Sequence, residues 1–213
     1  MNLRTWLVGA VALVVLAVVS GQVFSQDKPT QPPSTGMPPE MQAAMEKWMQ
    51  FAAPGQPHRE MAKRAGIWNA AVKMWWAGPD SPPTVTTGVS EVKVILDGRF
   101  ITEKFRCEMK MGDQTMGFEG FGISGYDNFK RMYTSFWVDN MGTQMILMLG
   151  SQPLGSNKLT FYGQMDEPLL GVQDRMVKSV VTLVSEDEHV FEMYDLLAGD
   201  DHKVMEITYT RAK

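Results

Sequence analysis

Cysteine is nearly absent from this sequence, since Cys107 is the only one, so the chain can form no internal disulfide. Lysine and arginine form no cluster and the net charge is −4, which gives no electrostatic basis for binding nucleic acid. No G-x-S-x-G or H-E-x-x-H motif occurs, and His58, His189 and His202 lack the spacing of metal ligands on one element. We therefore predict no metal and no cofactor, and no residue is identified as catalytic.

Long apolar runs are also missing except at the N-terminus. Arg4 precedes a 14-residue apolar run over residues 6–19, and small or tolerated residues at Val23 and Ser25 suit a cleavage site. The run is short for a hydrocarbon core, which needs about 20 residues. Residues 1–25 are predicted to be a signal peptide for export to the periplasm or beyond, with an uncleaved anchor as the alternative. Cleavage would remove Arg4 as the only charge, shift the net charge from −4 to −5, and leave no membrane span.

Three further segments follow the signal peptide. Residues 26–38 are rich in proline and predict an extended tether. Residues 39–65 are expected to be helical, with one amphipathic helix over 39–52 and a shorter one over 57–65. The first helix carries a stripe of methionines, which recur every four residues at Met37, Met41, Met45 and Met49. Methionine could bind Cu(I), but it is spread over the whole chain and is interpreted here as packing.

From residue 66 to 213 the apolar pattern has period two, which is typical of β-strands. Compact turns such as Asp97-Gly98 interrupt it every 8–14 residues. Strands are expected near 67–76, 85–96, 99–111, 115–125, 130–139, 143–150, 158–165, 174–185, 189–196 and 203–211. We predict an all-β fold, an antiparallel up-and-down β-barrel of about ten strands, because closure removes the edges of so long a sheet.

Gly120, Gly122 and Gly125 have the spacing G-x-G-x-x-G of a dinucleotide-binding loop. That loop requires a helix after the glycines, whereas here the alternating segment RMYTSFWV follows and predicts a strand. The glycines are therefore interpreted as positions for cross-strand aromatic packing or barrel bending.

Turn lengths predict which side chains face the interior. A hairpin at Asp97-Gly98 pairs Glu91 with Lys104 on the solvent face and turns Val92, Val94, Ile101, Phe105, Cys107, Met109 and Met111 inward. A three-residue loop at 112–114 is preferred over a two-residue loop because it pairs Phe105 with Phe121 rather than with Gly120.

A hairpin at Asp127-Asn128 then extends this register into the next strand. It directs Glu103 and Glu119 inward, and Gly120 and Gly122 outward. It also predicts an outer aromatic patch, formed by Phe118, Tyr133 and Trp137, which the helix at 39–52 could cover.

Trp68 lies in the first strand and Arg211 in the last, and these strands are neighbours in a closed barrel. The arginine is expected to stack on the indole and seal one end. Gly66-Ile67-Trp68 with a late arginine resembles the signature of the calycin superfamily, which includes the lipocalins.

A longer resemblance covers residues 54 to 211. It rests on the segments PGQPHREMAKRAGIWNAAVKMWW, LDGRFI, FEGFGISGYDNFKRMYTSFWVDNMGT, HVFEMYD and KVMEITYTR. These segments resemble the bacterial domain-of-unknown-function family numbered 1579. The resemblance implies an exported β-barrel and carries no catalytic residues.

The leading functional hypothesis is binding of a small, largely apolar ligand in the lumen of a monomeric or weakly associating barrel. The predicted lumen residues are Phe105, Met109, Glu119, Phe121, Ile123, Phe136 and Glu103, with Glu119 as polar anchor. A structural module that uses the outer aromatic patch is the main alternative. An enzyme that uses Glu103 and Glu119, and a haem-binding barrel, are further alternatives.

Overall fold

The computed structural model describes residues 37–111, 114–168 and 170–213. The chain divides into two compact units, residues 1–43 and 44–213. The predicted signal peptide and all but the last two residues of the predicted tether lie outside the described residues.

Two helices precede the strands, as the sequence predicts. α2 spans Pro39–Ala52, and its methionine stripe is exposed, as is Trp48 at 65 %. The Asn128 side-chain amide donates hydrogen bonds to the carbonyls of Phe51 and Ala53, so it caps the C-terminal end of α2. α3 spans Gln56–Ala62 and buries His58 and Met61.

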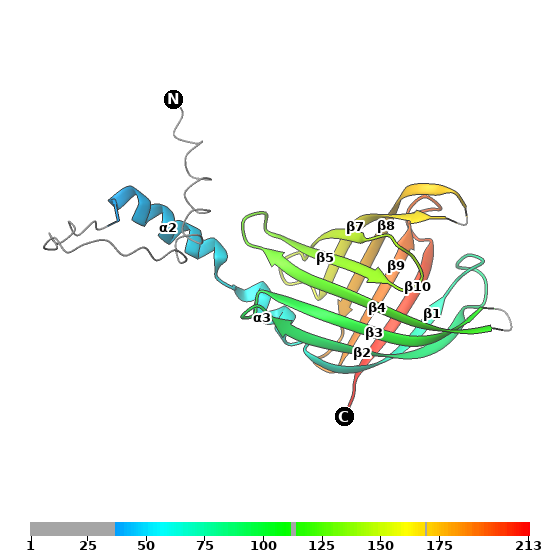
Figure 1. Cartoon of the computed structure of the whole chain (residues 1–213). Coiled ribbons are helices and arrows are strands. Elements are labelled where there is room, and N and C mark those ends of the chain that lie inside the picture. The colour runs from blue at the N-terminus through cyan, green and yellow to red at the C-terminus, as the bar shows by residue number, and fades with distance from the viewer. Residues whose placement is uncertain (1–36, 112–113, 169) are drawn as a thin grey trace, which may run out of the picture. The chain divides into compact units, whose positions relative to one another are not determined.

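Ten antiparallel strands form one closed barrel, which confirms the predicted fold class (Figure 1). The strands are β1 (Gly66–Met74), β2 (Thr84–Ile95), β3 (Phe100–Met111), β4 (Gln114–Asp127), β5 (Met132–Asp139), β6 (Ile146–Ser151), β7 (Lys158–Glu167), β8 (Val172–Leu183), β9 (Glu188–Asp195) and β10 (Lys203–Arg211). Each strand pairs with the next along the chain, and β10 returns to pair with β1. Closure satisfies the edge hydrogen bonds of every strand.

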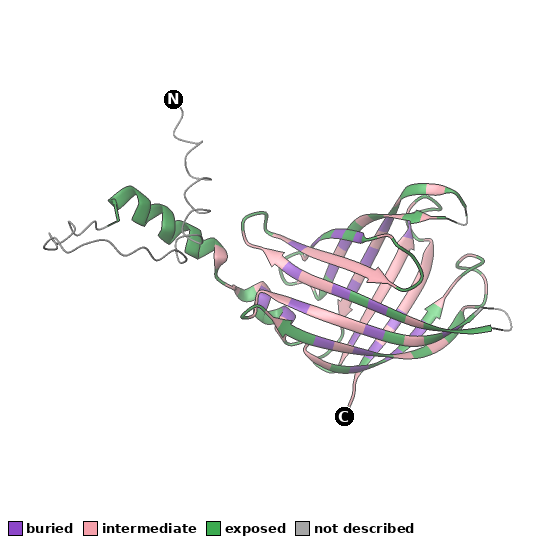
Figure 2. Ribbon diagram, in the orientation of Figure 1, coloured by how far each residue is buried: buried purple, intermediate pink, exposed green. Residues whose placement is uncertain are grey.

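Burial alternates along the strands, as Figure 2 shows by its bands of colour. In β1, for example, Trp68, Ala70 and Val72 are buried while their neighbours in sequence are exposed. Because successive side chains in a strand point to opposite faces, these alternate residues form the lining of the barrel and pack into one core.

The register of the β2–β3 hairpin agrees with the sequence prediction. Glu91 pairs with Lys104 and Val94 with Ile101. Residues Leu96 to Arg99 form the turn, in which Leu96, Asp97 and Gly98 all have positive φ. The inner face of this hairpin therefore contains Ser90, Val92, Ile101 and Phe105, all of them buried.

The predicted register of the β3–β4 hairpin is wrong by one residue. Phe105 pairs with Gly120, not with Phe121, and Met111 pairs with Gln114. A slip of one residue reverses every side chain. Gly120 and Gly122 therefore face the interior, and Phe121 faces solvent with 39 % exposure.

The β4–β5 turn is also longer than predicted. Asp127 pairs with Met132, so residues 128–131 form the turn. The Asp127 carboxylate accepts hydrogen bonds from the amides of Phe129 and Lys130, and Arg131 has a φ of 56°. The turn has two more residues than predicted, and an even difference does not change which β5 side chains share a face with those of β4. The wrong register of the β3–β4 hairpin therefore also reverses the predicted faces of β5.

The two glycines of β4 make room for a large side chain from β5. Trp137 pairs with Gly122, and its ring covers both Gly120 and Gly122. The glycines of the G-x-G-x-x-G segment are thus explained by aromatic packing over glycine, as predicted, but on the inner face of the barrel.

Substitution of Gly120 by alanine should destabilise the barrel by about 1–3 kcal/mol, since the added methyl group would overlap the Trp137 ring. Gly117 lies in the same strand with nothing within 4 Å of an added Cβ, so Gly117→Ala is the matched control. Urea unfolding of both variants measures the difference. Equal unfolding midpoints would contradict the placement of Trp137.

Candidate ligand-binding lumen

The helix α3 lies at one end of the barrel, where it contacts β3 and β4 (Figure 1). Buried His58 attaches it there: Nδ1 accepts a hydrogen bond from Gly55 N at 3.0 Å, and the ring hydrogen-bonds the backbone of Tyr126. Burial lowers the pKa of His58, which keeps the ring neutral and Nδ1 able to accept. Met61 joins the barrel core from the same helix. This end of the barrel is therefore covered.

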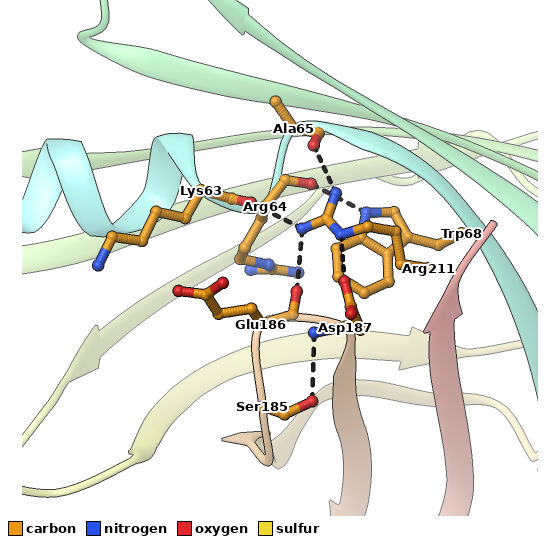
Figure 3. A network of polar contacts seen from close by, with 8 residues as sticks. All are labelled: Lys63, Arg64, Ala65, Trp68, Ser185, Glu186, Asp187 and Arg211. Carbon is orange, nitrogen blue, oxygen red and sulfur yellow. Dashed lines mark hydrogen bonds and ion pairs between the residues drawn. The ribbon is translucent and has the colours of Figure 1, made fainter. Parts of the chain in front are cut away.

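Trp68 and Arg211 meet at the covered end, which confirms the predicted closure (Figure 3). The Arg211 guanidinium lies 4.2 Å from the centre of the Trp68 ring. It also donates to the carbonyls of Ala65, Lys63 and Glu186 and to the Asp187 carboxylate. Trp68, only 2 % exposed, donates its indole N–H to the Arg64 carbonyl at 2.9 Å. One arginine thus joins β10 to the β8–β9 turn and to the segment before β1.

Aromatic rings continue from Trp68 along the inner face of the barrel. Trp68 meets His189 edge-on, and His189 stacks on Tyr209, each pair with centroids 4.5 Å apart. Tyr209 contacts Phe105, which in turn contacts Phe118. Edge-on and stacked contacts of this kind contribute beyond the area they bury.

His189 is held in its neutral form. It is 3 % exposed, and its pKa falls to about 3 because of burial and the nearby charges of Arg64 and Arg211. Arg64 Nη2 lies 3.4 Å from His189 Nε2, and because a guanidinium only donates, Nε2 carries no proton. The Nε atom of Arg64 is buried without a hydrogen-bond partner among the described residues.

A carboxylate lies on the inner face beside Tyr209. Ser90, fully buried, donates its hydroxyl to Glu103 Oε1 at 2.7 Å, and the Tyr209 hydroxyl also hydrogen-bonds Glu103. Burial, followed by the charge of Glu103, raises the pKa of Tyr209 well above its usual value, so the phenol stays protonated and donates. Glu103 is partly exposed, although it faces inward.

A second carboxylate lies in the next strand pair. Trp137 donates its indole N–H to Asp139 Oδ2 at 3.0 Å, and Asp139 Oδ1 accepts from Met141 N. Glu103 pairs with Gly122, and Gly122 pairs with Trp137, so Glu103 and Trp137 occupy one cross-strand row. The Glu103 carboxylate itself is directed toward β2 and β10, where Ser90 and Tyr209 hydrogen-bond it.

Sulphur-containing and aromatic side chains form most of the remaining inner wall. The methionines on inner positions are Met74, Met109, Met148, Met165, Met193 and Met205, and the other partly buried residues that pack against the core include Cys107, Phe118, Phe191 and Leu183. Burial raises the pKa of the Cys107 thiol, which keeps it protonated. Methionine side chains are flexible, so the packing of this wall can adjust.

An ion pair stabilises β8 against β9. Arg175 Nε donates to Asp195 Oδ1 at 2.8 Å, and Arg175 Nη2 contacts the other carboxylate oxygen. Asp195 also accepts a hydrogen bond from Leu197 N. Burial alone would raise the pKa of Asp195, but the hydrogen bonds from Arg175 and Leu197 lower it by more. The carboxylate and the guanidinium therefore both stay charged and neutralise each other.

Of the predicted lumen residues, Phe105, Met109 and Glu103 face the interior. The others lie on the outer wall because of the register slip: Glu119, Phe121, Ile123 and Phe136. Glu119 forms ion pairs with Lys104 and Arg106, whose hydrogen bonds lower its pKa. It cannot serve as the polar anchor, and it cannot act together with Glu103, since the two lie on opposite faces of the sheet.

The predicted outer aromatic patch is likewise inside the barrel. Tyr133 is 6 % exposed, and Phe118 and Trp137 pack against the core. No patch made by these rings is therefore available for α2 to cover.

The residues missed by the sequence prediction are those that surround Glu103. Ser90 and Tyr209 alternate in step with buried neighbours, and this periodicity could have placed them inside. Trp137 could have been found by asking which ring would fill the space left by Gly120 and Gly122.

A groove of about 780 Å³ lies on the outer wall of the barrel, across β10, β1, β2 and β3. Its lining includes the outward side chains Asn69, Ala71, Thr87, Val89, Arg106, Glu108, Thr208 and Thr210. The lining also includes the inner-face residues Ala70, Gly88 and Cys107, and it contains none of the predicted ligand-binding residues.

Within the described ranges, no group of three or more histidine, cysteine, aspartate or glutamate residues could hold a metal ion. Among the described helices, none has the length and apolar character needed to cross a membrane.

Comparisons with known proteins identify a family. A search of curated proteins found no match to the chain. Among solved structures, a redesigned β-barrel is similar with 13% sequence identity and a TM-score of 0.36, covering 71% of this chain and 93% of its own. A protein-family profile, described as "Protein of unknown function (DUF1579)", matches residues 53–211. The match covers both α3 and all ten strands, and the chain therefore belongs to the DUF1579 family.

Proposed function

We propose that this protein binds a small, largely apolar molecule inside its barrel. The ligand would enter at the end opposite α3 and lie against the methionine-rich wall. Its polar group would reach Glu103, which replaces Glu119 as the anchor. Ligand sites in proteins are commonly apolar cavities with a few placed polar groups, and the lining described above has that composition.

The observation that carries the proposal is the partial exposure of inward-facing side chains. Glu103, Cys107, Trp137 and Phe191 all point into a closed barrel, yet each keeps accessible surface. An inward-facing side chain with accessible surface borders solvent-accessible space within the barrel or at its open end, and either place gives a ligand access to the inner wall.

We further propose that the protein is exported and acts outside the cytoplasm, as a monomer or weak oligomer. This rests on the N-terminal segment, in which Arg4 precedes the apolar run and Val23 and Ser25 suit a cleavage site. Detection of a mature chain that begins near Gln26 in the host envelope fraction would support it. A full-length chain confined to the cytoplasm would contradict it.

Lumen binding is tested by a substitution that places a larger side chain on the inner wall of the barrel. Cys107→Phe adds volume on the inner face and should weaken binding of the neutral dye Nile red at least tenfold, while Cys107→Leu should weaken it less. Val89→Phe is the matched control, since Val89 is 48% exposed on the outer wall. Fluorescence titration measures dye affinity, and circular dichroism checks the fold. Equal affinity in all of these variants would contradict binding in the lumen.

A structural module with a solid core was the alternative. The rings assigned to its contact surface lie inside the barrel. The alternative therefore loses the surface on which it was based, and lumen binding is the function that the geometry supports best.

A further inference from the structure

We infer that two copies of this protein associate through α2, which docks on an apolar patch on the outer wall of the other copy's barrel. The inference does not depend on ligand binding in the lumen. It is carried by two apolar surfaces of one chain, both of which are exposed in the structure.

The first surface, the outer apolar patch, lies on β4, β5, β6 and β7. Its residues are Phe121, Ile123, Phe136, Leu147, Leu149 and Tyr162. Phe136 pairs with both Ile123 and Leu147, so these side chains are direct neighbours across three strands. Leu147 is 60% exposed and Tyr162 is 49% exposed. A contiguous apolar area on an outer wall marks an interaction surface.

β6 has the sequence of a strand that is covered on both faces. Ile146 and Met148 are buried on the inner face, while Leu147 and Leu149 alternate with them and face outward. An antiparallel sheet with one face in solvent normally carries polar residues on that face. The outer face of β6 is therefore expected to be covered by another element.

The second surface is the apolar face of α2. It consists of Met41, Met45, Trp48 and Met49, which are 44% to 65% exposed. The C-terminal end of α2 is held at the β4–β5 turn, where Asn128 caps it and the Phe51 ring meets the Phe129 ring at 5.5 Å. With these contacts formed, α2 buries none of its residues. The apolar face is thus left for a second molecule.

The spacing of the α2 methionines matches the spacing of the patch. Met41, Met45 and Met49 are four residues apart, which is about 6 Å along the helix axis. Successive outward residues of one strand, such as Leu147 and Leu149, are about 6.6 Å apart. A helix that lies along the strands can therefore place its methionines over successive rows of the patch.

Charge favours contact between a helix and a patch over contact between two patches. Lys104 pairs with Phe121 on one flank, and Lys178 pairs with Tyr162 on the other. Arg106 shares an outer face with Lys104, and Glu119 forms ion pairs with both. Three positive charges and one negative charge give these flanks a net charge of +2. Two patches face to face would therefore repel at their flanks.

The helix carries the opposite sign. α2 contains Glu40, Glu46 and Lys47, which gives it a net charge of −1. In a two-fold dimer each copy supplies one helix and one patch, so the contact forms twice. Two short helices bury less than a standard interface of about 1,600 Å², so the dimer should be weak and reversible.

Sedimentation equilibrium of the purified mature protein tests the inference. We expect a reversible equilibrium between monomer and dimer at micromolar concentrations. Trp48→Asp on α2 and Leu147→Asp on the outer apolar patch should each weaken dimerisation about tenfold or more, because each places a charge within an apolar contact.

Matched controls carry the same new charge elsewhere. Gln50→Asp is the control for the helix, since Gln50 lies about 200° from Trp48 around the helix axis. Val85→Asp is the control for the patch, since Val85 is 62% exposed on the outer face of β2. Both controls should leave dimerisation unchanged.

A mixture of the Trp48→Asp and Leu147→Asp proteins tests which surfaces meet. In each variant alone, both contacts of the dimer contain one altered surface. A mixed dimer keeps one intact helix on one intact patch, so the mixture should dimerise more tightly than either variant. Circular dichroism checks the fold, and Leu147→Asn repeats the test without a charge if Leu147→Asp does not fold.

A protein that stays monomeric over the whole concentration range would overturn the inference. So would a dimer that only one of the two variants weakens, because contact between two helices or between two patches needs only one of the surfaces. Recovery of dimerisation in the mixture would support it. Nile red binding and its sensitivity to Cys107→Phe test the proposed function separately, whatever the outcome here.

Discussion

Replacement of Trp68 by alanine should lower the free energy of unfolding by about 3–5 kcal/mol, the largest effect expected for a single side chain here. The indole is 2% exposed, lies under the Arg211 guanidinium and contacts the His189 ring. Its loss leaves a cavity and removes the N–H donor from the Arg64 carbonyl. Urea unfolding, analysed for both midpoint and slope, measures the change.

Trp76→Ala is the matched control for that experiment. Trp76 is 62% exposed, so its removal should change stability by about 0.5 kcal/mol or less. A loss below 1 kcal/mol for Trp68→Ala, or equal losses for the two tryptophans, would show that the barrel does not close on Trp68.

Acidification should destabilise the protein before most carboxylates titrate, because His189 must be neutral in the folded state. Its folded pKa is about 3 and its unfolded value is 6.5. Between these values the unfolded chain binds the extra proton, so stability is fully present above pH 6.5 and falls as the pH drops toward 3. The expected loss between pH 7 and pH 5 is about 2 kcal/mol. His58, whose pKa is also lowered by burial, acts with the same sign.

His189→Gln separates this effect from general acid destabilisation. Glutamine offers an acceptor for Arg64 but does not titrate, so the stability difference between pH 7 and pH 5 should shrink markedly. His202→Gln is the control, since His202 is not buried. If His189→Gln retains the full pH dependence, His189 is not the group responsible.

The architecture could be predicted from the sequence because its signals are local. Alternation identifies strands, and turn residues separate them. The β2–β3 register followed from Asp97-Gly98 and from the opposite charges of Glu91 and Lys104, both readable within one hairpin. The closure by Trp68 and Arg211 followed from topology, since the first and last strands of a closed barrel are neighbours.

The faces of β4 and β5 could not be predicted from pairs of neighbouring strands. Phe105 opposite Phe121 looked better than Phe105 opposite Gly120, because apolar pairs stabilise a sheet. The true register is favoured by a third strand, from which Trp137 fills the space above the glycines. Only a comparison across three strands reveals that packing.

The same error determined which part of the site was found. Glu103 was placed correctly because it belongs to the hairpin with the correct register. Glu119 and Phe121 were predicted to face inward because they lie in β4, after the hairpin whose register was predicted wrongly by one residue. The polar environment of Glu103 depends on Tyr209, about 100 residues away in sequence, and a local reading of β3 could not include it.

The central claim is that ligands bind inside the barrel, and NMR of a protein labelled at its methionine methyl groups tests it most directly. With decanol bound, we expect intermolecular nuclear Overhauser effects from the alkyl chain to Met193 and Met205, which line the lumen. Met145 and Met176, which are 69% and 41% exposed, should show none. Contacts to Met145, Met176 or the α2 methionines with none to Met193 and Met205 would contradict the claim.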